Sequence, residues 1–410
     1  MAIHSKRDHL PSLLLLPFPP EPAGRQALSA AYRPSIAAAL AKLKGGPVHS
    51  KLIIAVVCPI LQGPFARSKA LAWPEAQSLL AGLYTLVAVI CAELSIPAEA
   101  DAGPGSVDAT VVLVDHDRKR RFFPDFRPTV EPNNTVVVDF STFASAYYPW
   151  NYIFHVRSEV GLEVYQTYLK LAEGRQVLLQ SQLVAVDGGL TLNLASPSPP
   201  ARSPSPTYST VCLGGTFDHL HPGHKLLLTA AALLLAVPEK GSSSPCTYII
   251  GITGDEMLRN KKFAAYVQPW EDRARGVIAF LATVLDLSSR GWKDGHGYSI
   301  DEQDDEFVAT LRDGTIAIRC VKIQDAFGPT ITLEDIHALV VSGETRSGGQ
   351  AVNDRREAMG WGLLEVYEVD VLDPDEIQDV PVQAEGFASK LSSTAIRKRR
   401  AEAATTPQEP

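Results

Sequence analysis

The sequence contains few cysteines, and their arrangement is not that of a disulfide or metal site. Five cysteines are spread over 410 residues, and no two of them form a Cys-x-x-Cys pair. An odd number of widely spaced cysteines argues against a disulfide framework and against a zinc site. We therefore expect buried thiols in a reducing compartment, and we expect Cys212 to be a packing residue in a strand.

An excess of positive charge and a long apolar segment are also absent. The 46 acidic residues outnumber the 38 basic ones, and the formal net charge of −8 argues against a general nucleic-acid binder. The longest apolar stretch, residues 79–96, contains polar side chains and has no basic flank, so we expect a buried helix. The leucine run at 13–16 is too short for a signal peptide. We expect a cytoplasmic protein with no nucleic-acid or membrane partner.

Strand-like and helical segments alternate in two regions of the chain, and a Ser/Pro-rich stretch separates them. Residues 196–207 alternate Ser with Pro, which lacks an N–H donor and fixes φ, so they predict a linker. Residues 1–195 predict a separate α/β domain of unknown function. Residues 208–400 predict a parallel sheet with helices on both faces, and residues 401–410 a disordered tail. If the linker is real, the second domain should stay soluble without the first.

Apolar patterning gives the expected elements of both regions. Strands are predicted at 51–59, 109–115, 135–140, 176–186, 208–213, 246–253, 315–323, 337–342 and 362–370. Helices are predicted at 35–44, 74–96, 156–172, 221–237, 270–285, 350–360 and from 392. The polar residues 288–305 interrupt the pattern and predict a surface insertion.

The string GGTFDHLHPGH at residues 214–224 carries the strongest functional signal. It lies between a predicted strand and a predicted helix, where α/β proteins present phosphate-binding groups. Gly215 lets the backbone approach a ligand, and Pro222 suits the first turn of a helix. His221 and His224 share one face at the helix N-terminus, which attracts polyphosphate. Metal binding by the two histidines and simple capping are the alternatives, but no third ligand follows at a zinc spacing.

Several segments together carry a resemblance to a known family. The string at 214–224 resembles the HxGH signature of the nucleotidyltransferase superfamily, and LSSTAIR at 391–397 is similar to the SSTxxR motif of adenylyltransferases. Further segments resemble the eukaryotic-type phosphopantetheine adenylyltransferases: 251–255, 258–261, 268–273, 325–330, 340–345, 348–349 and 351–353. The N-terminal half resembles the poorly characterised N-terminal region of fungal members. The resemblance implies a Rossmann-like nucleotidyltransferase domain at 208–400.

The resemblance implies a reaction that is consistent with these residue types. AMP would pass from ATP to 4′-phosphopantetheine, giving 3′-dephospho-coenzyme A and pyrophosphate, with Mg²⁺ accompanying ATP. The attacking phosphate monoester is already anionic, so the protein has to supply positioning and charge stabilisation rather than a general base. The sequence shows no set of protein ligands for a metal.

The resemblance also implies roles for individual residues. His224 would contact the α-phosphate in the transition state, His221 would hold the β- and γ-phosphates, and Thr216 would orient the incoming phosphate. Lys261, or Lys262 in an alternative register, would bind phosphate. The remaining expected substrate-binding residues are Gly215 and Phe217 in the turn, Ser392, Ser393, Thr394 and Arg397 around the ATP phosphates, and Gly343 and Glu344 near the adenine or pantetheine.

Three further polar residues are expected to be structural. Asp218 should accept backbone hydrogen bonds, with a magnesium ligand as the alternative. We expect His219 to be exposed, and Arg273 to form an ion pair with Glu271.

Several motifs of related enzyme classes are absent, which reduces the number of possible functions but leaves more than one open. No GxxxxGK[ST] loop occurs, so we expect no fused dephospho-coenzyme A kinase. The RTxG of cytidylyltransferases is absent, and no KMSKS-like loop of an aminoacyl-tRNA synthetase is present. The Arg-Gly-Leu-Arg of the bacterial branch is also absent, which leaves the pantetheine contacts open. A nicotinamide mononucleotide or CTP-dependent transferase, and a non-catalytic nucleotide-binding regulator, remain alternatives.

Overall fold

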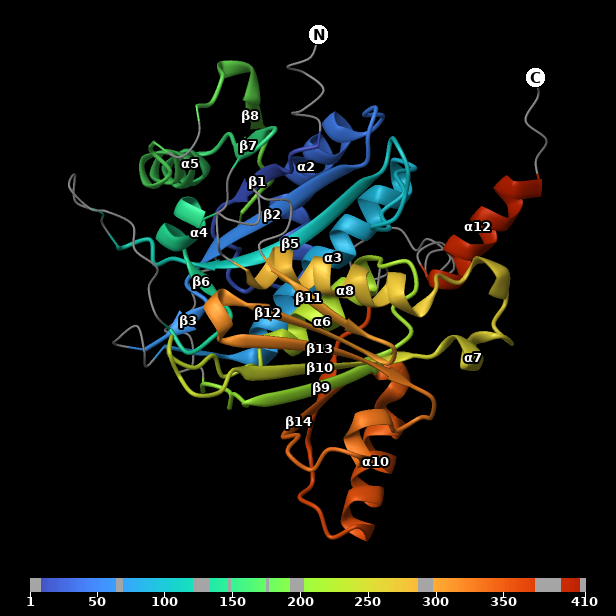
Figure 1. The fold of residues 1–410 in the computed structure, drawn as a ribbon. Helices are drawn as coiled ribbons and strands as arrows, with labels where there is room; N and C mark the ends of the chain where they lie inside the picture. Colours follow the sequence, from blue (N-terminus) through green and yellow to red (C-terminus); the bar gives the residue numbers. More distant parts are fainter. Residues whose placement is uncertain are drawn as a thin grey trace.

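Two large sheets, one from each half of the chain, form the framework of the protein (Figure 1). The computed structural model describes residues 9–63, 69–120, 122, 133–146, 149–174, 177–191, 203–286, 298–372 and 392–405. Both sheets are predominantly parallel, as the sequence predicts, and both alternate with helices along the chain.

The N-terminal sheet has six parallel strands in the order β6-β5-β2-β1-β7-β8. Its strands are β1 (Ser12–Leu16), β2 (Ser50–Cys58), β5 (Val107–Asp115), β6 (Val138–Asp139), β7 (Ile153–Val156) and β8 (Leu183–Val186). Its helices are α2 (Arg25–Leu43), α3 (Trp73–Glu93), α4 (Phe140–Ala146) and α5 (Glu159–Leu171), and β3 (Leu61–Gln62) pairs with β4 (Ala70–Leu71) beside it.

The C-terminal sheet has seven strands in the order β11-β12-β13-β10-β9-β14-β15. Five of them are parallel: β9 (Thr210–Gly215), β10 (Cys246–Thr253), β13 (Ile316–Ile323), β14 (Ala338–Ser342) and β15 (Glu365–Val369). An antiparallel hairpin, β11 (Ile300–Gln303) and β12 (Glu306–Leu311), extends one edge. The helices are α6 (Pro222–Ala232), α7 (Asp255–Leu258), α8 (Trp270–Leu285), α10 (Arg346–Ala358) and α12 (Ser393–Thr405).

The order of the five parallel strands is Rossmann-like. In chain order the strands β9, β10, β13, β14 and β15 are arranged 3-2-1-4-5, so the direction of winding reverses between β9 and β14. Ligands of open α/β sheets bind at such a switch point, outside the carboxyl ends of the strands. The segment 214–224 begins with the last two residues of β9 and therefore lies at this point.

Most predicted elements of the C-terminal half are present, with β10 and α8 at the predicted bounds. The prediction of a disordered tail is wrong for residues 401–405, which continue α12. Residues 406–410 lie outside the described residues. Of the predicted insertion 288–305, residues 300–303 form β11, and the part up to 297 lies outside the described residues.

The N-terminal half departs more from the sequence prediction. The leucine run at 13–16 lies in a completely buried strand near the middle of the sheet, and the sequence patterns did not predict this strand. Helix α2 begins ten residues earlier than predicted and continues through Pro34, because Leu28 and Tyr32 before it are buried against the core. The predicted strand 135–140 is cut short, since the Asp139 carboxylate accepts hydrogen bonds from the backbone N–H groups that begin α4.

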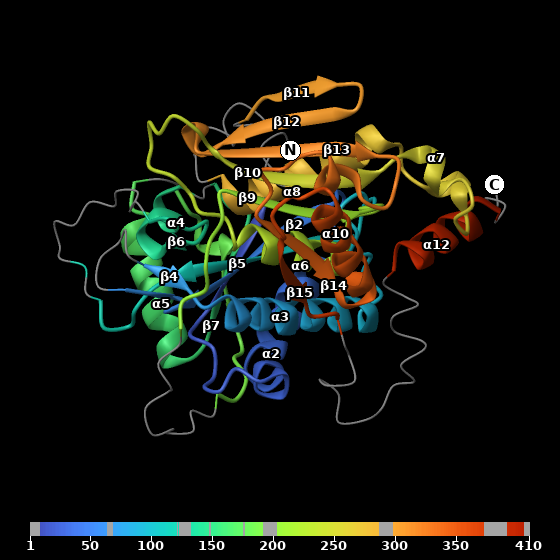
Figure 2. The same cartoon turned by 90° about the horizontal axis from the view of Figure 1, so that it is seen from below.

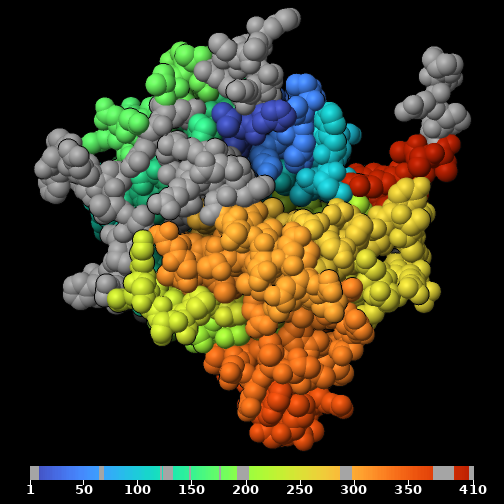
Figure 3. Space-filling view, viewed as in Figure 1, coloured from blue at the N-terminus to red at the C-terminus, as the bar shows by residue number. Residues whose placement is uncertain are grey.

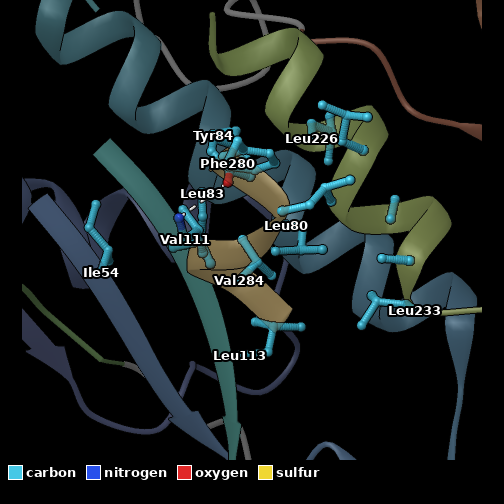
Figure 4. Packing of buried hydrophobic residues seen from close by; sticks show 14 of the residues in the cluster. Ile54, Leu80, Leu83, Tyr84, Val111, Leu113, Leu226, Leu233, Phe280 and Val284 are labelled. Atoms are coloured by element: carbon cyan, nitrogen blue, oxygen red, sulfur yellow. Dashed lines mark hydrogen bonds between the residues drawn. The ribbon is translucent and has the colours of Figure 1, made fainter. Parts of the chain in front are cut away.

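The largest hydrophobic core cluster joins the two sheets. Helix α3 of the N-terminal half packs against α6 of the C-terminal half, and Figure 4 shows side chains of α3, β5, α6 and α8 interlocking. The Trp73 indole donates a hydrogen bond of 2.8 Å to the Ala230 carbonyl across this interface. A separate N-terminal domain is therefore not confirmed, because the largest core cluster contains residues of both halves, although each half also has a smaller cluster of its own.

Polar contacts also fix the chain around the predicted linker. The backbone N–H of Ser205 donates to the Leu71 carbonyl at 2.8 Å, and its hydroxyl accepts from the N–H of Trp73 at 2.9 Å. Residues 196–202 of the predicted linker lie outside the described residues. The described end of this segment is thus tied to the start of α3.

Helix α3 accounts for the longest apolar segment. It is long and apolar enough to cross a membrane by length and composition, but 83% of its most apolar window is buried inside the protein. This burial is as expected for a core helix. All five cysteines are free and buried, as predicted, and burial raises the pKa of the Cys212 thiol to about 12.

Candidate active site

The glycine–histidine turn (residues 214–224) adopts a backbone that only certain residues tolerate. Phe217 and His219 have φ of +51° and +49°, in the left-handed region that costs energy for residues with a side chain. A Cβ on Gly215 would lie 2.8 Å from the Phe217 ring, so only glycine fits there. The hydroxyl of Thr253, from β10, donates to the Gly215 carbonyl at 3.2 Å. Close packing, as well as ligand access, therefore dictates the glycine.

The two histidines of the turn stack on each other at the start of α6. Their ring centroids are 3.9 Å apart, and His221 caps the helix by accepting a hydrogen bond from the N–H of Gly223 at 3.2 Å. The buried Nδ1 of His224 has no hydrogen-bond partner within the described part of the chain. Burial is the main cause that lowers the pKa of His221 to about 4 and that of His224 well below its usual value.

This pair of rings is suited to an anion. Both imidazoles are neutral near pH 7, and they lie at a helix N-terminus, where unpaired N–H groups and the helix dipole favour negative charge. The unpartnered Nδ1 of His224 could donate to a ligand oxygen without losing an existing contact.

The two segments that carry the signatures meet in space. The Arg397 guanidinium is 3% exposed and donates to the Asp218 carboxylate at 2.6 Å, and the Ser393 hydroxyl donates to the Asp218 carbonyl at 2.9 Å. Ser392 accepts from the N–H of Ala395 at 3.3 Å at the start of α12. Tertiary structure therefore brings two segments about 175 residues apart into direct contact at one side of the candidate site.

The remaining nitrogens of Arg397 are also engaged. Its Nε donates to the Lys262 carbonyl at 3.1 Å, and one terminal nitrogen donates to the Thr394 hydroxyl at 3.0 Å. The guanidinium thus fastens the glycine–histidine turn, α12 and the segment after α7 to one another. These contacts use three of the five N–H donors of Arg397, which leaves two for the expected contact with the ATP phosphates.

Lys261 and Lys262 follow α7 and are both exposed. Neither ammonium group has a hydrogen-bond or ion-pair partner within the ranges that the structure describes. Both lie beside α12 through the Arg397–Lys262 contact. Two free cations next to the joined segments suit a phosphate ligand, and the geometry does not distinguish between them.

Gly343 and Glu344 are exposed at the carboxyl end of β14, the strand next to β9 across the switch point. The structure thus places them at the same end of the sheet as the glycine–histidine turn, beyond the neighbouring strand. Leu372, beyond β15, comes near the same place, since a Cβ on Gly223 would lie 3.7 Å from its side chain. No motif in the sequence marks this segment as part of the site.

Two of the three structural expectations need correction. Asp218 accepts a hydrogen bond from the N–H of Gln268 at 2.9 Å and is fully buried, as expected of a structural acceptor. His219 is only 1% exposed, so its expected exposure is wrong. Arg273 pairs with Asp255 at 2.5 Å and donates to the Thr216 carbonyl at 2.7 Å, instead of pairing with Glu271.

The protein offers few ligands for the expected Mg²⁺. Among the described residues, no three His, Cys, Asp or Glu side chains lie where they could hold a metal ion together. The Asp218 carboxylate is already occupied by Arg397 and by a backbone N–H.

The comparisons with known proteins each match about half of the chain. Residues 1–192 match the family model of a domain of unknown function (DUF8446). A phosphopantetheine adenylyltransferase of Saccharomyces cerevisiae is 32% identical over 206 residues, which are 50% of this chain and 53% of that protein. An uncharacterized protein of Schizosaccharomyces pombe is 35% identical over 192 residues, or 47% of this chain and 48% of that one. The chain thus spans about half the length of these two relatives.

Shorter archaeal proteins are matched over most of their length. The phosphopantetheine adenylyltransferase of Pyrococcus abyssi is 32% identical over 190 residues, which are 46% of this chain and 89% of that protein. A solved structure of a protein with unknown function from Archaeoglobus fulgidus is 28% identical, with a TM-score of 0.26, and covers 40% of this chain and 99% of that chain.

The fold and the site define an α/β protein with a Rossmann-like sheet and a glycine–histidine turn at its switch point. The sequence identity to the archaeal enzymes, which extends over most of their length, shows the family. The chain belongs to the phosphopantetheine adenylyltransferase family.

Proposed function

We propose that the protein transfers AMP from ATP to 4′-phosphopantetheine, giving 3′-dephospho-coenzyme A and pyrophosphate in coenzyme A biosynthesis. The single observation that carries the proposal is the meeting of the glycine–histidine turn with α12, through Arg397 and Ser393 on Asp218. The names of the relatives support the choice of acceptor.

In the proposed reaction, an oxygen of the phosphopantetheine phosphate attacks the α-phosphorus of ATP. A new P–O–P bond forms, the bond between the α-phosphorus and the bridging oxygen breaks, and pyrophosphate leaves. The phosphate nucleophile is anionic at neutral pH, so no proton has to be removed. The chain's own task is to align the two phosphates and to stabilise the charge that develops between them.

Each residue of the turn has a place in this scheme. The Nδ1 or Nε2 of His224 donates to the α-phosphate as it becomes pentavalent, and His221 holds the β- and γ-phosphates at the helix N-terminus. The Thr216 hydroxyl and the N–H groups at Gly215 and Phe217 orient the incoming phosphate. The crowded, left-handed backbone of the turn fixes these groups before substrate arrives.

The start of α12 and the segment after α7 supply hydroxyl groups and positive charge. Lys261 or Lys262 binds the leaving phosphates, while Ser392 and Thr394 offer hydroxyls at the N-terminus of α12. Arg397 acts as a positioning residue through Asp218. Gly343 and Glu344, at the carboxyl end of β14, lie beside the adenine or the pantetheine arm. Mg²⁺ bound to the ATP phosphates would neutralise part of their charge.

A pyrophosphate-release assay tests the proposal directly. The full chain is incubated with ATP, Mg²⁺ and one of three acceptors: 4′-phosphopantetheine, nicotinamide mononucleotide or phosphocholine, the last also with CTP. Turnover with 4′-phosphopantetheine alone is expected. Preference for another acceptor would assign a different transferase, and ATP binding without pyrophosphate release from any acceptor would favour a nucleotide-binding regulator.

The five buried, free cysteines suit a reducing compartment, and we propose that the reaction takes place in the cytoplasm. Location of the tagged full chain by microscopy and fractionation tests this point independently of activity.

A further inference from the structure

One carboxylate of the N-terminal half contacts three parts of the C-terminal half at once. Asp101 lies between α3 and β5, and its Oδ2 is 2.8 Å from Nδ1 of His219 in the glycine–histidine turn. The same oxygen accepts from the Gln268 side chain at 3.1 Å and pairs with Arg400 of α12 at 2.8 Å. In the space-filling view, α12 (red) adjoins both the cyan N-terminal residues and the yellow segment after β10 (Figure 3).

The His219 contact lies in the middle of the most constrained backbone of the site. With φ of +49°, His219 has a conformation that surrounding contacts must maintain. Its backbone N–H donates to the Gln268 side-chain oxygen at 2.7 Å, and its Nε2 is 2.9 Å from the Tyr266 carbonyl. Asp101 thus holds the His219 ring directly and its backbone through Gln268.

The ring contacts also define a charge state. Both ring nitrogens of His219 face oxygens that can only accept, so satisfying both requires the imidazolium form. Burial alone lowers the pKa of His219, but the hydrogen bond to Asp101, the charges of Asp218 and Asp101 and the Tyr266 carbonyl together raise it above its usual value. Asp101 therefore stabilises a buried positive charge two residues before His221.

The other charged groups around His219 do not replace Asp101. The Asp218 carboxylate is 3.6 Å from Nε2, but Arg397 already binds it. Arg400 binds Asp101 itself, and the neutral His221 and His224 lie further along the turn. Removing the Asp101 charge therefore leaves the Nδ1 of His219 without its anionic partner.

We infer that Asp101 is a positioning residue through which the N-terminal half holds the glycine–histidine turn, the 266–268 segment and α12 in their relative places. The inference rests on the proposed function only for its kinetic readout. It assigns a task at the nucleotide site to a region that matches a domain of unknown function.

The same loop offers a matched control. Glu99, two residues earlier, is 7% exposed and pairs through both oxygens with Arg399 of α12, at 3.0 and 3.1 Å. Glu99→Gln removes one negative charge and one α12 contact but leaves His219 and Gln268 untouched. If Asp101→Asn and Glu99→Gln differ in kcat or in the His219 pKa, the difference is due to the lost contacts with the turn and not to the loss of one negative charge.

The experiment compares the full-length wild type, Asp101→Asn and Glu99→Gln. Pyrophosphate release is measured from pH 6 to 9, ATP affinity by calorimetry, and the His219 pKa by NMR of the imidazole carbons. For Asp101→Asn we expect a kcat roughly 10- to 100-fold lower, the scale for small misplacement of reacting groups. We also expect a lowered His219 pKa, whereas Glu99→Gln should behave like the wild type.

Wild-type kcat, pH profile and His219 pKa in Asp101→Asn would overturn the inference, as would equal effects of the two variants. If Asp101→Asn does not fold, Asp101→Glu replaces it, since it keeps the charge but moves the carboxylate. A shifted pH profile in Asp101→Glu supports the inference, and an unchanged one overturns it. If the wild type releases no pyrophosphate, the proposed function fails, and the ATP affinity and the His219 pKa still decide the role of Asp101.

Discussion

At the scale of single residues, His224 is where the site meets the reacting atoms in the proposed mechanism. Its Nδ1 is buried and has no partner within the described part of the chain, so its removal leaves the protein's own hydrogen bonds intact. We expect His224→Ala to keep the fold and to lower kcat by on the order of 10²–10³, the scale for one lost transition-state donor. Steady-state pyrophosphate release together with circular dichroism checks this, and near-wild-type turnover would remove His224 from its assigned role.

His221 connects the site to acid stability. Its pKa is about 4 in the folded protein, because burial disfavours the imidazolium, against 6.5 in the unfolded chain. Between these values the unfolded state binds the extra proton, so the free energy of unfolding falls as the pH drops from 6.5 toward 4. We expect protonation of this residue to lower the free energy of unfolding by on the order of 1–3 kcal/mol. This loss of stability develops below pH 6.5 and is absent above it.

The matched variant for this test is His221→Asn, because an asparagine oxygen can also accept the capping hydrogen bond from Gly223 but does not titrate. Urea unfolding at several pH values should show a shallower acid decline in His221→Asn than in the wild type. Parallel pH curves would contradict the assignment.

At the scale of elements, one ion pair links α6 to β5 across the two halves. The Lys225 ammonium is 1% exposed and binds the Asp108 carboxylate and, at 2.9 Å, the Ala109 carbonyl. Lys225→Met should lower the free energy of unfolding by about 3–5 kcal/mol, since it leaves a largely buried carboxylate without its cation. The denaturation midpoint of the full chain measures this.

An exposed ion pair provides the comparison. Lys240 and Asp313 are 77% and 59% exposed, so Lys240→Met should change the free energy of unfolding by less than about 1 kcal/mol. The double variant Lys225→Met/Asp108→Asn should be less destabilised than Lys225→Met alone. Equal midpoints for Lys225→Met and Lys240→Met would show that the Lys225 pair adds nothing beyond a surface contact.

At the scale of the whole molecule, the shared core decides whether the halves can be separated. Seen from below, α3 lies alongside α6, β14 and β15 of the C-terminal sheet (Figure 2). Removing residues 1–200 would expose the face of α6 against which α3 now packs. The sequence predicted an independent C-terminal domain, and the structure leads us to expect the opposite.

We therefore expect the chain without residues 1–200 to aggregate or to unfold without cooperativity, and to regain solubility when residues 1–200 are co-expressed. Size-exclusion chromatography and thermal melting of both preparations check this. A soluble, cooperatively melting monomer from the truncated chain would mean that the Ser/Pro segment is a true domain boundary.

The sequence by itself determined the features that local chemistry governs. β-branched runs gave β10 and apolar periodicity gave α8 at their observed bounds, and the turn after β9 followed from glycine, proline and a helix start within eleven residues. It also gave the α/β class and the family. Leu13–Leu16 were missed because a short, uninterrupted apolar run has no periodicity that separates a buried strand from a helix segment.

Tertiary structure alone decided which distant groups meet. No spacing rule in the sequence relates Asp101 to His219, 118 residues away, or Arg397 to Asp218, 179 residues away. The Asp101 contact arises because the two sheets bury helices against each other, and the free energy of that burial comes from apolar area rather than from any local pattern. The Arg397 contact arises within the C-terminal half, where α12 returns to the turn after β9. The chemistry of the turn can therefore be read from the sequence, whereas what holds the turn in place depends on the packing of the whole chain.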